Sequence, residues 1–320
     1  MRRRFGASAA IDKLSVPSLG GSNRTVVFDL VEGAARRRLV SRQETLVTDH
    51  SPFLPPADQF RTMQAVYRHG FPVPEPVFEY DAADGMGAGF VSAFVEGETF
   101  PKALVESEQF AAVRPRLLVQ FGELLAQLHS LPPAEFGFLR QWPDSVDALQ
   151  AQRRRIDHYG EPHPALELAL RWLERHRPPP APAPAVFLHG DFRIGNIMAG
   201  PRGVTAVLDW ECSHLGAPLE DLGWLSTRSW RFGRPQLPVG GIGPWQPFLD
   251  AYRGAGGGHA DPESIRYWQV FGLMRWTVLN IMQAFEHVHR GRRGPVFAAC
   301  GRNTALIEYE LLMTLAGRYD

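Results

Sequence analysis

Three side chains that carry oxygen atoms lie close together in the middle of the sequence. Asp191 and Asn196 stand five residues apart in the stretch FLHGDFRIGNIM, and Asp209 follows thirteen residues after Asn196. If residues 197–199 and 204–208 pair as a hairpin, Asn196 and Asp209 lie side by side at its open end. Asp191 then lies just in front of them, so we expect two carboxylates and a carboxamide to converge on one point.

Such a group of oxygens suits phosphoryl transfer. Carboxylate and carboxamide oxygens are hard ligands of the kind that Mg²⁺ prefers. The reaction needs in-line positioning, a metal that neutralises phosphate oxygens, and one group that orients and deprotonates the attacking hydroxyl. Protein kinases carry an Asp, an Asn five residues later and a metal-binding Asp on the next strand. The ordered set HGDxxxxN…LDWE therefore predicts a phosphoryl-transferring enzyme, although each part alone is a weak signal.

A metal-dependent hydrolase is an alternative use of the same segment. It would combine His189, Asp191, Cys212 and His214, but no H-x-x-x-H or C-x-x-C spacing supports it. Cys212 and His214 are expected to be structural, because no third partner for a nucleophile and base is visible. Cys212 and Cys300 form no disulfide framework, so we expect free thiols in a reducing cytosol.

The elements that must position these residues change in kind along the chain. In the first hundred residues, β-branched and apolar runs at 25–31 and 37–43 predict a hairpin. Apolar residues at helical spacing predict a helix over 55–70, and residues 87–97 read as a buried strand ending in a turn. Helical patterns then follow over 114–131, 146–157, 163–176, 218–228, 244–254, 261–289 and 294–316.

This order predicts an α+β fold with two lobes. Residues 1–97 are expected to form a small β-rich lobe, and residues 98–320 a larger, mainly helical lobe that holds the catalytic loop and the acceptor site. The chain has 320 residues, of which 44% are hydrophobic, which is enough for two cores.

The charge balance argues against large polyanionic partners. Lys plus Arg and Asp plus Glu both number 34, so the net charge is zero and neither nucleic acid nor a membrane surface is expected as a partner. No apolar run approaches the ~18 residues of a membrane-spanning helix. The basic start MRRRFGASAA lacks the apolar segment of a secretory signal, so we expect a cytoplasmic protein.

The motifs HGDFRIGN, LDWE and GAPLEDLGWL resemble those of the aminoglycoside phosphotransferase/choline kinase superfamily, which has a protein-kinase-like fold. The resemblance runs from LGGSNRT to the C-terminal helices and so covers nearly the whole chain. It is greatest to the phosphotransferase group that includes the kinase-like domain of some animal acyl-CoA dehydrogenases. It implies a bilobal fold with MgATP or MgGTP between the lobes and a small-molecule hydroxyl as the phosphate acceptor.

The resemblance also implies roles for the residues of the catalytic centre. Asp191 would be the catalytic base, and Arg193 would lie near the transferred phosphate. Asn196 and Asp209 would hold Mg²⁺.

Further residues would support the loop or bind the nucleotide. By the same resemblance, His189 packs and forms hydrogen bonds within the loop, and Asp221 braces it from the next helix. The nucleotide-binding residues would be Gly20, Gly21, Ser22 and Asn23 in a first turn, Arg42 on the following strand, and Ala93, Phe94 and Val95 in the inter-lobe hinge.

The phosphate-binding cation departs from the kinase pattern. Protein kinases pair a lysine on the third strand with a helix glutamate, but neither Lys13 nor Lys102 has that position. Arg42 takes the place of the lysine, and its partner position falls on Gln59 or the adjacent Asp58. An arginine fork binds phosphate in a bidentate manner, so activity is expected to persist.

The acceptor is harder to predict from the sequence. Arg228, Arg231 and Arg234 either line the substrate cleft or form a solvated helix end. Because acidic and basic residues balance after Asp209, we expect a neutral or anionic metabolite, such as a hydroxyacyl thioester. An aminoglycoside or other antibiotic is the alternative acceptor. A nucleotide-binding pseudokinase that acts as a scaffold or sensor is an alternative of another class, since the lysine is absent.

Overall fold

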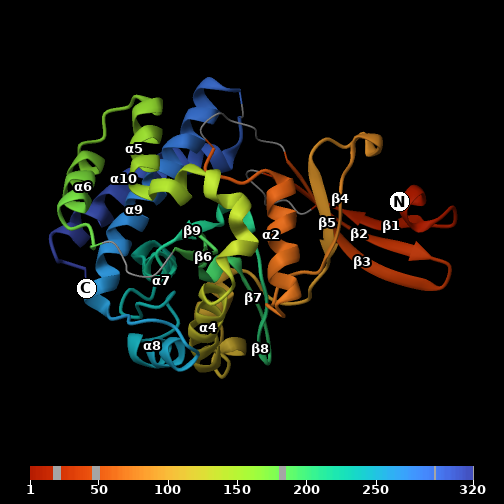
Figure 1. Cartoon of the computed structure of the whole chain (residues 1–320), viewed down its shortest axis with the longest axis horizontal. Helices are drawn as coiled ribbons and strands as arrows, with labels where there is room; N and C mark the ends of the chain where they lie inside the picture. Colours follow the sequence, from red (N-terminus) through yellow and green to blue (C-terminus); the bar gives the residue numbers. More distant parts are fainter. Residues whose placement is uncertain (17–22, 45–50, 180–184, 292, 320) are drawn as a thin grey trace.

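The computed structural model describes residues 1–16, 23–44, 51–179, 185–291 and 293–319. A strand-rich lobe at the N-terminal end adjoins a larger helical lobe, as Figure 1 shows. The mixed, two-lobed architecture predicted from the sequence is confirmed.

The N-terminal lobe is built on a five-stranded sheet in which every neighbouring pair is antiparallel, in the order β1-β2-β3-β5-β4. The hairpin predicted over 25–31 and 37–43 is confirmed, because β2 and β3 pair along their whole length. A first strand and a short first helix were not expected from the sequence. The elements are α1 (Arg2–Phe5), β1 (Ala10–Ser15), β2 (Asn23–Glu32), β3 (Ala35–Glu44), α2 (Pro56–Arg68), β4 (Pro76–Glu79) and β5 (Gly89–Ala93).

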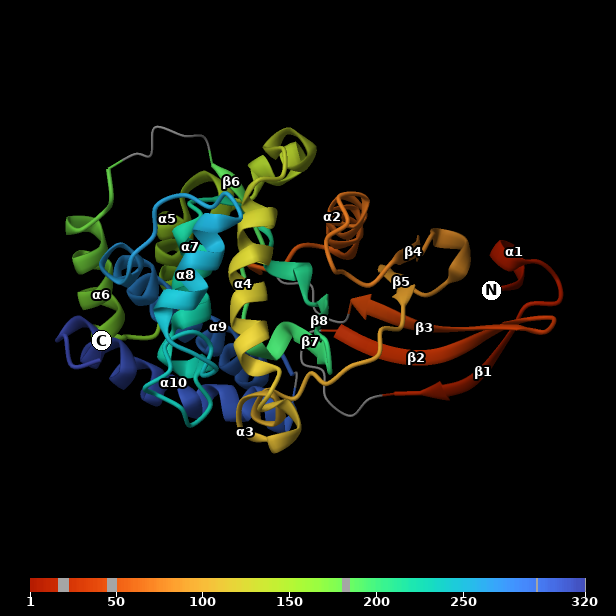
Figure 2. The same cartoon turned by 90° about the horizontal axis from the view of Figure 1, so that it is seen from below.

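Helix α2 packs against β4 and β5 of this sheet (Figure 2). Pro56 opens the helix, where its missing N–H costs nothing. Phe60, Met63 and Val66 recur at helical spacing, and all three are buried. The Phe60 ring meets the Phe90 ring of β5 at 5.9 Å between centroids. The apolar stripe of α2 thus explains why this single helix covers the sheet.

The segment after β5 connects the two lobes. Glu98 forms a two-way backbone bridge with Ala199 of the helical lobe, with N–O distances of 2.8 and 2.9 Å. This bridge fixes the connecting segment against the hairpin that follows the catalytic loop.

The C-terminal lobe is mainly helical and contains two small two-stranded sheets, β6 with β9 and β7 with β8. The long helix α9 packs against α5, α6, α7 and α10, while α4 packs against α8. No helix in the described part of the chain is both long enough and apolar enough to cross a bilayer. The elements are α3 (Pro101–Glu106), α4 (Arg114–His129), α5 (Pro143–Tyr159), α6 (Pro164–Arg175), β6 (Val186–Leu188), β7 (Ile197–Gly200), β8 (Gly203–Val207), β9 (His214–Gly216), α7 (Leu219–Ser226), α8 (Trp245–Gly254), α9 (Pro262–His289) and α10 (Pro295–Leu315).

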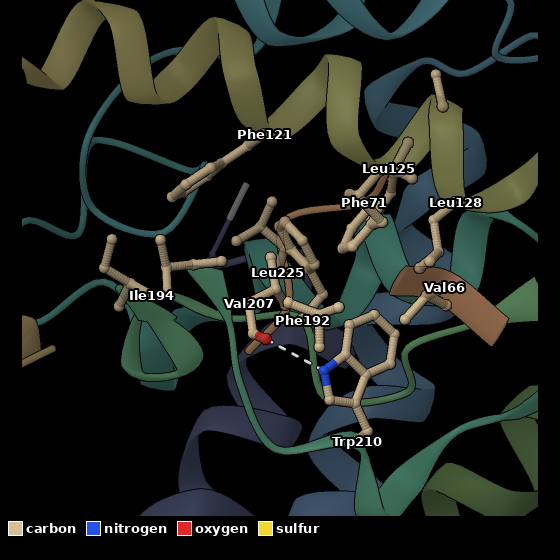
Figure 3. Close-up of a cluster of buried hydrophobic side chains, with 14 of the residues drawn as sticks. Val66, Phe71, Phe121, Leu125, Leu128, Phe192, Ile194, Val207, Trp210 and Leu225 are labelled. Carbon is tan, nitrogen blue, oxygen red and sulfur yellow. Dashed lines mark hydrogen bonds between the residues drawn. The ribbon is translucent and has the colours of Figure 1, made fainter. Parts of the chain in front are cut away.

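Apolar residues of the catalytic loop anchor it to this lobe (Figure 3). Phe192 and Ile194 are completely buried. The Phe192 ring meets Phe121 of α4 edge-on, with centroids 5.7 Å apart. Trp210 lies at the other side of the cluster, where its indole Nε1 donates to the Val207 carbonyl at 3.1 Å. Burial of these rings holds the polar residues between them in place.

Candidate active site

The catalytic loop begins with a tight turn directly after β6. Gly190 has a φ of +74°, in the left-handed region, and a Cβ at this position would overlap the Cys212 carbonyl oxygen. Gly195, at the other end of the loop, does not share this conformation. Its φ is not positive, but a Cβ there would overlap the guanidinium of Arg193.

Asp221 of α7 braces this turn. Its Oδ2 accepts from the His189 backbone N–H at 3.0 Å, and its Oδ1 accepts from the Gly190 N–H at 2.9 Å. The His129 imidazole lies 3.3 Å from Oδ2. Complete burial works to raise the pKa of Asp221, but His129 outweighs it and the pKa lies below its ordinary value. The carboxylate therefore stays charged and holds two backbone donors of the loop.

His189 ties the loop to the strand that precedes Asp209. Its Nε2 lies 3.0 Å from the Leu208 carbonyl oxygen, and its Nδ1 lies 3.1 Å from the Asp191 N–H. This pattern assigns a neutral ring with the proton on Nε2. Burial lowers the pKa of His189, which agrees with that assignment. His189 thus links the loop to the residue that precedes Asp209.

Asp191 is held by donors from three directions. Its Oδ1 accepts from Arg193 Nε at 3.0 Å and from the Trp224 indole Nε1 at 2.7 Å. Its Oδ2 accepts from Asn196 Nδ2 at 2.6 Å. The carboxylate is therefore oriented before any ligand binds. The sequence gives no signal for the indole contact, because a tryptophan in a helical pattern is usually a core residue.

Asn196 and Asp209 meet at the open end of the β7–β8 hairpin. Ile197 pairs with Val207, and the Leu208 N–H donates to the Asn196 carbonyl at 2.8 Å. Asp209 has a φ of +69°, an uncommon conformation that Asp tolerates better than most residues. The expected hairpin therefore brings the carboxamide and the second carboxylate together beside Asp191.

Arg42 of β3 reaches across to these residues from the other lobe. Its Nη1 lies 2.7 Å from Asp209 Oδ1, and its Nη2 lies 3.2 Å from Glu211 Oε2. Burial works to raise the pKa of Asp209, but the charge of Arg42 outweighs it and the pKa lies below its ordinary value. The same two carboxylates outweigh the effect of burial on Arg42, so the pKa of the guanidinium is raised.

The expected partner of Arg42 was wrong. Gln59 of α2 is buried and donates to the Leu54 carbonyl at 2.7 Å, and among the described residues Arg42 forms no ion pair with Asp58. The partners are instead Asp209 and Glu211, the latter being the last residue of the motif LDWE. In the sequence, the only signal for this partner of Arg42 was the position of a glutamate two residues after Asp209.

A cavity of about 430 Å³ opens beside this cluster, lined by both lobes. Arg42, Asn196 and Asp209 lie at its polar side, and the hinge residues 93–95 form part of its wall. Gly20, Gly21 and Ser22 lie outside the described residues, as does the side chain of Asn23, whose backbone begins β2. The apolar lining includes Val27, Val40, Phe90, Met198 and Leu208.

The expected arginines after α7 have separate surroundings. Arg231 is 5% exposed, and its guanidinium donates to the carbonyls of Ser226 and Pro235. Burial lowers its pKa to about 10. Arg231 therefore fixes its own loop, and its expected contact with substrate is withdrawn. Arg228 lies 3.8 Å from the centroid of the Tyr319 ring, while Arg234 is partly exposed.

The hydrolase alternative finds no support in this geometry. Cys212 and Cys300 are free thiols, and burial raises the pKa of Cys212 well above its ordinary value. His214 is paired with Glu220 at 3.1 Å. In the described part of the chain, no group of three or more His, Cys, Asp or Glu side chains is placed to hold a metal.

The oxygens of the cluster do fit Mg²⁺ together with a nucleotide. Asn196 commits its Nδ2 to the carboxylate and the carbonyl of Asp191, which leaves its amide oxygen as the ligand atom. Asp209 supplies a carboxylate beside it. Mg²⁺ is usually held by one or two protein oxygens, with phosphate oxygens and water completing the octahedron.

The fold thus has two lobes, and two carboxylates, a carboxamide and an arginine gather at the cavity between them, as in kinase-like phosphotransferases. Residues 13–268 match the model of the phosphotransferase enzyme family, designated APH, and the chain belongs to this family. Members of this family are phosphotransferases, and this chain is an enzyme of that class.

Sequence relatives point to one group. Acyl-CoA dehydrogenase family member 11 of Gallus gallus is 35% identical over 187 residues, which cover 55% of this chain and 24% of that protein. The Homo sapiens protein of the same name is 32% identical over 180 residues, covering 52% and 22%. The chain thus spans about a quarter of the length of these relatives.

Solved structures share the fold along nearly the whole chain. A Ralstonia eutropha protein assigned as an aminoglycoside phosphotransferase superposes with a TM-score of 0.71 at 21% identity, covering 98% of this chain and 95% of that one. Ethanolamine kinase of Plasmodium vivax gives a TM-score of 0.64 at 11% identity, covering 96% and 84%. These likenesses show a common fold and leave the acceptor open.

Proposed function

We propose that this protein transfers the γ-phosphoryl group of ATP or GTP to a hydroxyl of a neutral or anionic small molecule. The observation that carries the proposal is that Arg42, Asn196 and Asp209 line the inter-lobe cavity together. Asp191 lies directly behind them, bonded to Asn196. We also propose that the enzyme acts in the cytoplasm, where nucleoside triphosphates are available.

The cavity suits a purine nucleotide. Its apolar residues would sandwich the base against the hinge at 93–95, with the phosphates directed to Arg42. The guanidinium is already anchored by Glu211, so it is held in place when the phosphates arrive. The backbone N–H groups of residues 20–23 would donate hydrogen bonds to the phosphates, as the family resemblance implies.

Mg²⁺ would be held by the Asn196 amide oxygen and the Asp209 carboxylate, and when bound it neutralises charge on the phosphate oxygens. Asp191 would accept a hydrogen bond from the acceptor hydroxyl, orient it toward the γ-phosphorus and take its proton. The guanidinium carbon of Arg193 lies 4.7 Å from the centroid of the Trp230 ring, and its Nε contacts Asp191. Arg193 would form hydrogen bonds with the transferred phosphoryl group.

The charges near Asp191 favour an acceptor that is not a polycation. Arg193 lies beside this carboxylate and keeps part of its side chain exposed, whereas Arg275, which donates to the Gly190 carbonyl, is buried. A polycationic aminoglycoside would be repelled by the Arg193 guanidinium, whereas a thioester of a hydroxy acid would not. The acyl-CoA dehydrogenase relatives add the hydroxyacyl thioester as the first compound to test.

The acceptor is tested with purified protein, Mg²⁺ and γ-labelled ATP or GTP against hydroxyacyl-CoA thioesters, free hydroxy acids, choline, ethanolamine and aminoglycosides. The proposal predicts label transfer to a neutral or anionic acceptor. Transfer to aminoglycosides alone would reverse the preference for such acceptors. If the protein binds nucleotide but neither transfers the label nor slowly hydrolyses the nucleotide, the pseudokinase alternative is favoured.

A further inference from the structure

The base is held by an aromatic donor that lies outside the catalytic motif. Trp224 stands in α7, three residues after Asp221, and is only 2% exposed. Its Nε1 is 2.7 Å from Asp191 Oδ1. Trp230 and Trp276 pack around it, with ring centroids 5.2 and 6.5 Å away. A buried indole usually finds a partner for its N–H, and here the partner is the reactive carboxylate itself.

The two carboxylate oxygens of Asp191 differ in the number of hydrogen bonds that they accept. Oδ1 accepts from Arg193 Nε and Trp224 Nε1, so both of its in-plane lone pairs are used. Oδ2 accepts one hydrogen bond within the described part of the chain, from Asn196 Nδ2. A carboxylate oxygen offers about two such lone pairs, so one lone pair on Oδ2 is left for the acceptor hydroxyl.

Arg275 of α9 secures the other end of this arrangement. Its Nη1 donates to the Gly190 carbonyl at 2.5 Å, immediately before the base. Its guanidinium carbon lies 5.0 Å from the centroid of Trp224, over the ring. Arg275 is 3% exposed. The indole therefore cannot turn away from Asp191 without losing the guanidinium that also fixes the backbone of the loop.

We propose that Trp224 is a positioning residue of the phosphotransferase reaction: it holds Asp191 Oδ1 so that Oδ2 faces the acceptor and receives its proton. In this step the acceptor O–H bond breaks and its proton goes to Oδ2. A bond forms between the acceptor oxygen and the γ-phosphorus, and the bond to the bridging oxygen breaks, releasing the nucleoside diphosphate. The inference rests on the proposed function.

The test separates the N–H from the shape of the ring. Trp224→Phe keeps an aromatic ring, and replacement of Trp224 by benzothienylalanine keeps the bicyclic shape while removing only the N–H. Both are expected to lower kcat about tenfold or more, with the KM values for nucleotide and acceptor little changed. Trp276→Phe is the matched control, since Trp276 lies in the same cluster without a bond to Asp191, and its kcat is expected to stay near that of the wild type.

A benzothienylalanine variant with wild-type kcat would overturn the inference while leaving the proposed function intact. So would a loss of kcat that Trp276→Phe matches, because that pattern reports packing. A wild-type protein that transfers phosphate to no acceptor overturns the proposed function first. The indole N–H resonance of Trp224, identified by Trp224→Phe, gives an independent readout. It should lose protection from solvent exchange in Asp191→Ala, and unchanged protection would contradict the hydrogen bond.

Discussion

At the scale of single residues, the chemistry of the site depends on one backbone position as much as on its charged groups. Gly190 stands between His189 and Asp191, and both the left-handed φ and the nearby Cys212 carbonyl exclude a side chain. Its N–H is bound by Asp221, and its carbonyl by Arg275. Helices α7 and α9 thus both bind the loop through the backbone of Gly190.

Gly190→Ala is expected to destabilise the fold by roughly 2–5 kcal/mol, since a strained φ and a backbone overlap act together. Denaturant unfolding measures the change. Gly254→Ala in α8 is the control, because a Cβ there meets nothing within 4 Å and its effect should be under about 1 kcal/mol. Equal stability of the two variants would contradict the crowding at Gly190.

At the scale of elements, Arg42 joins the two lobes through Glu211 and Asp209. We expect Glu211→Gln to weaken binding of the magnesium nucleotide about tenfold, which is about 1.4 kcal/mol, because Arg42 loses a charged anchor. Titration calorimetry measures the affinity. Glu75→Gln provides the control, since Glu75 binds another arginine of β3, Arg37, at the exposed surface. An affinity unaffected by Glu211→Gln would show that Arg42 needs no anchor.

The pairing of β9 with α7 adds a pH-dependent contribution to stability. Burial works to lower the pKa of His214, but Glu220 outweighs it and raises the pKa to about 8, from 6.5. A raised pKa in the folded state means that the pair stabilises fully below about pH 6.5 and that this stabilisation is lost as pH rises through about 8. From the shift, the contribution is about 2 kcal/mol.

Unfolding free energies of the wild type and of His214→Asn, measured from pH 6 to pH 9, test this effect. Their difference should shrink as the pH rises through about 8. A difference that stays constant over this interval would show that His214 does not gain its proton on folding.

At the scale of the whole molecule, strong periodic signals predicted the elements well and local contacts poorly. The helices from α4 to α10 and the β2–β3 hairpin follow apolar patterns that burial enforces. Strand β1 has an exposed residue at every position, so it carries no such pattern. Its pairing depends on β2, which no local rule reveals.

The site divides in the same way. Asp191, Asn196 and Asp209 could be brought together from spacing, because a hairpin dictates their proximity. The partner of Arg42 and the role of Trp224 could not, since both contacts join elements far apart in the sequence. A tryptophan in a helical pattern is usually a core residue, and only the position of Asp191 in the structure reveals the hydrogen bond of Trp224. Arg231 failed as a substrate residue because its loop turns the guanidinium inward.

The central claim is that Asp191 acts on the acceptor and that the nucleotide is held by other residues. Asp191→Asn is therefore measured in two ways, by calorimetry for the affinity of the magnesium nucleotide and by label transfer from γ-labelled nucleotide to the best acceptor. The account predicts an affinity close to that of the wild type and a turnover reduced at least about a hundredfold. Full turnover in Asp191→Asn would contradict it.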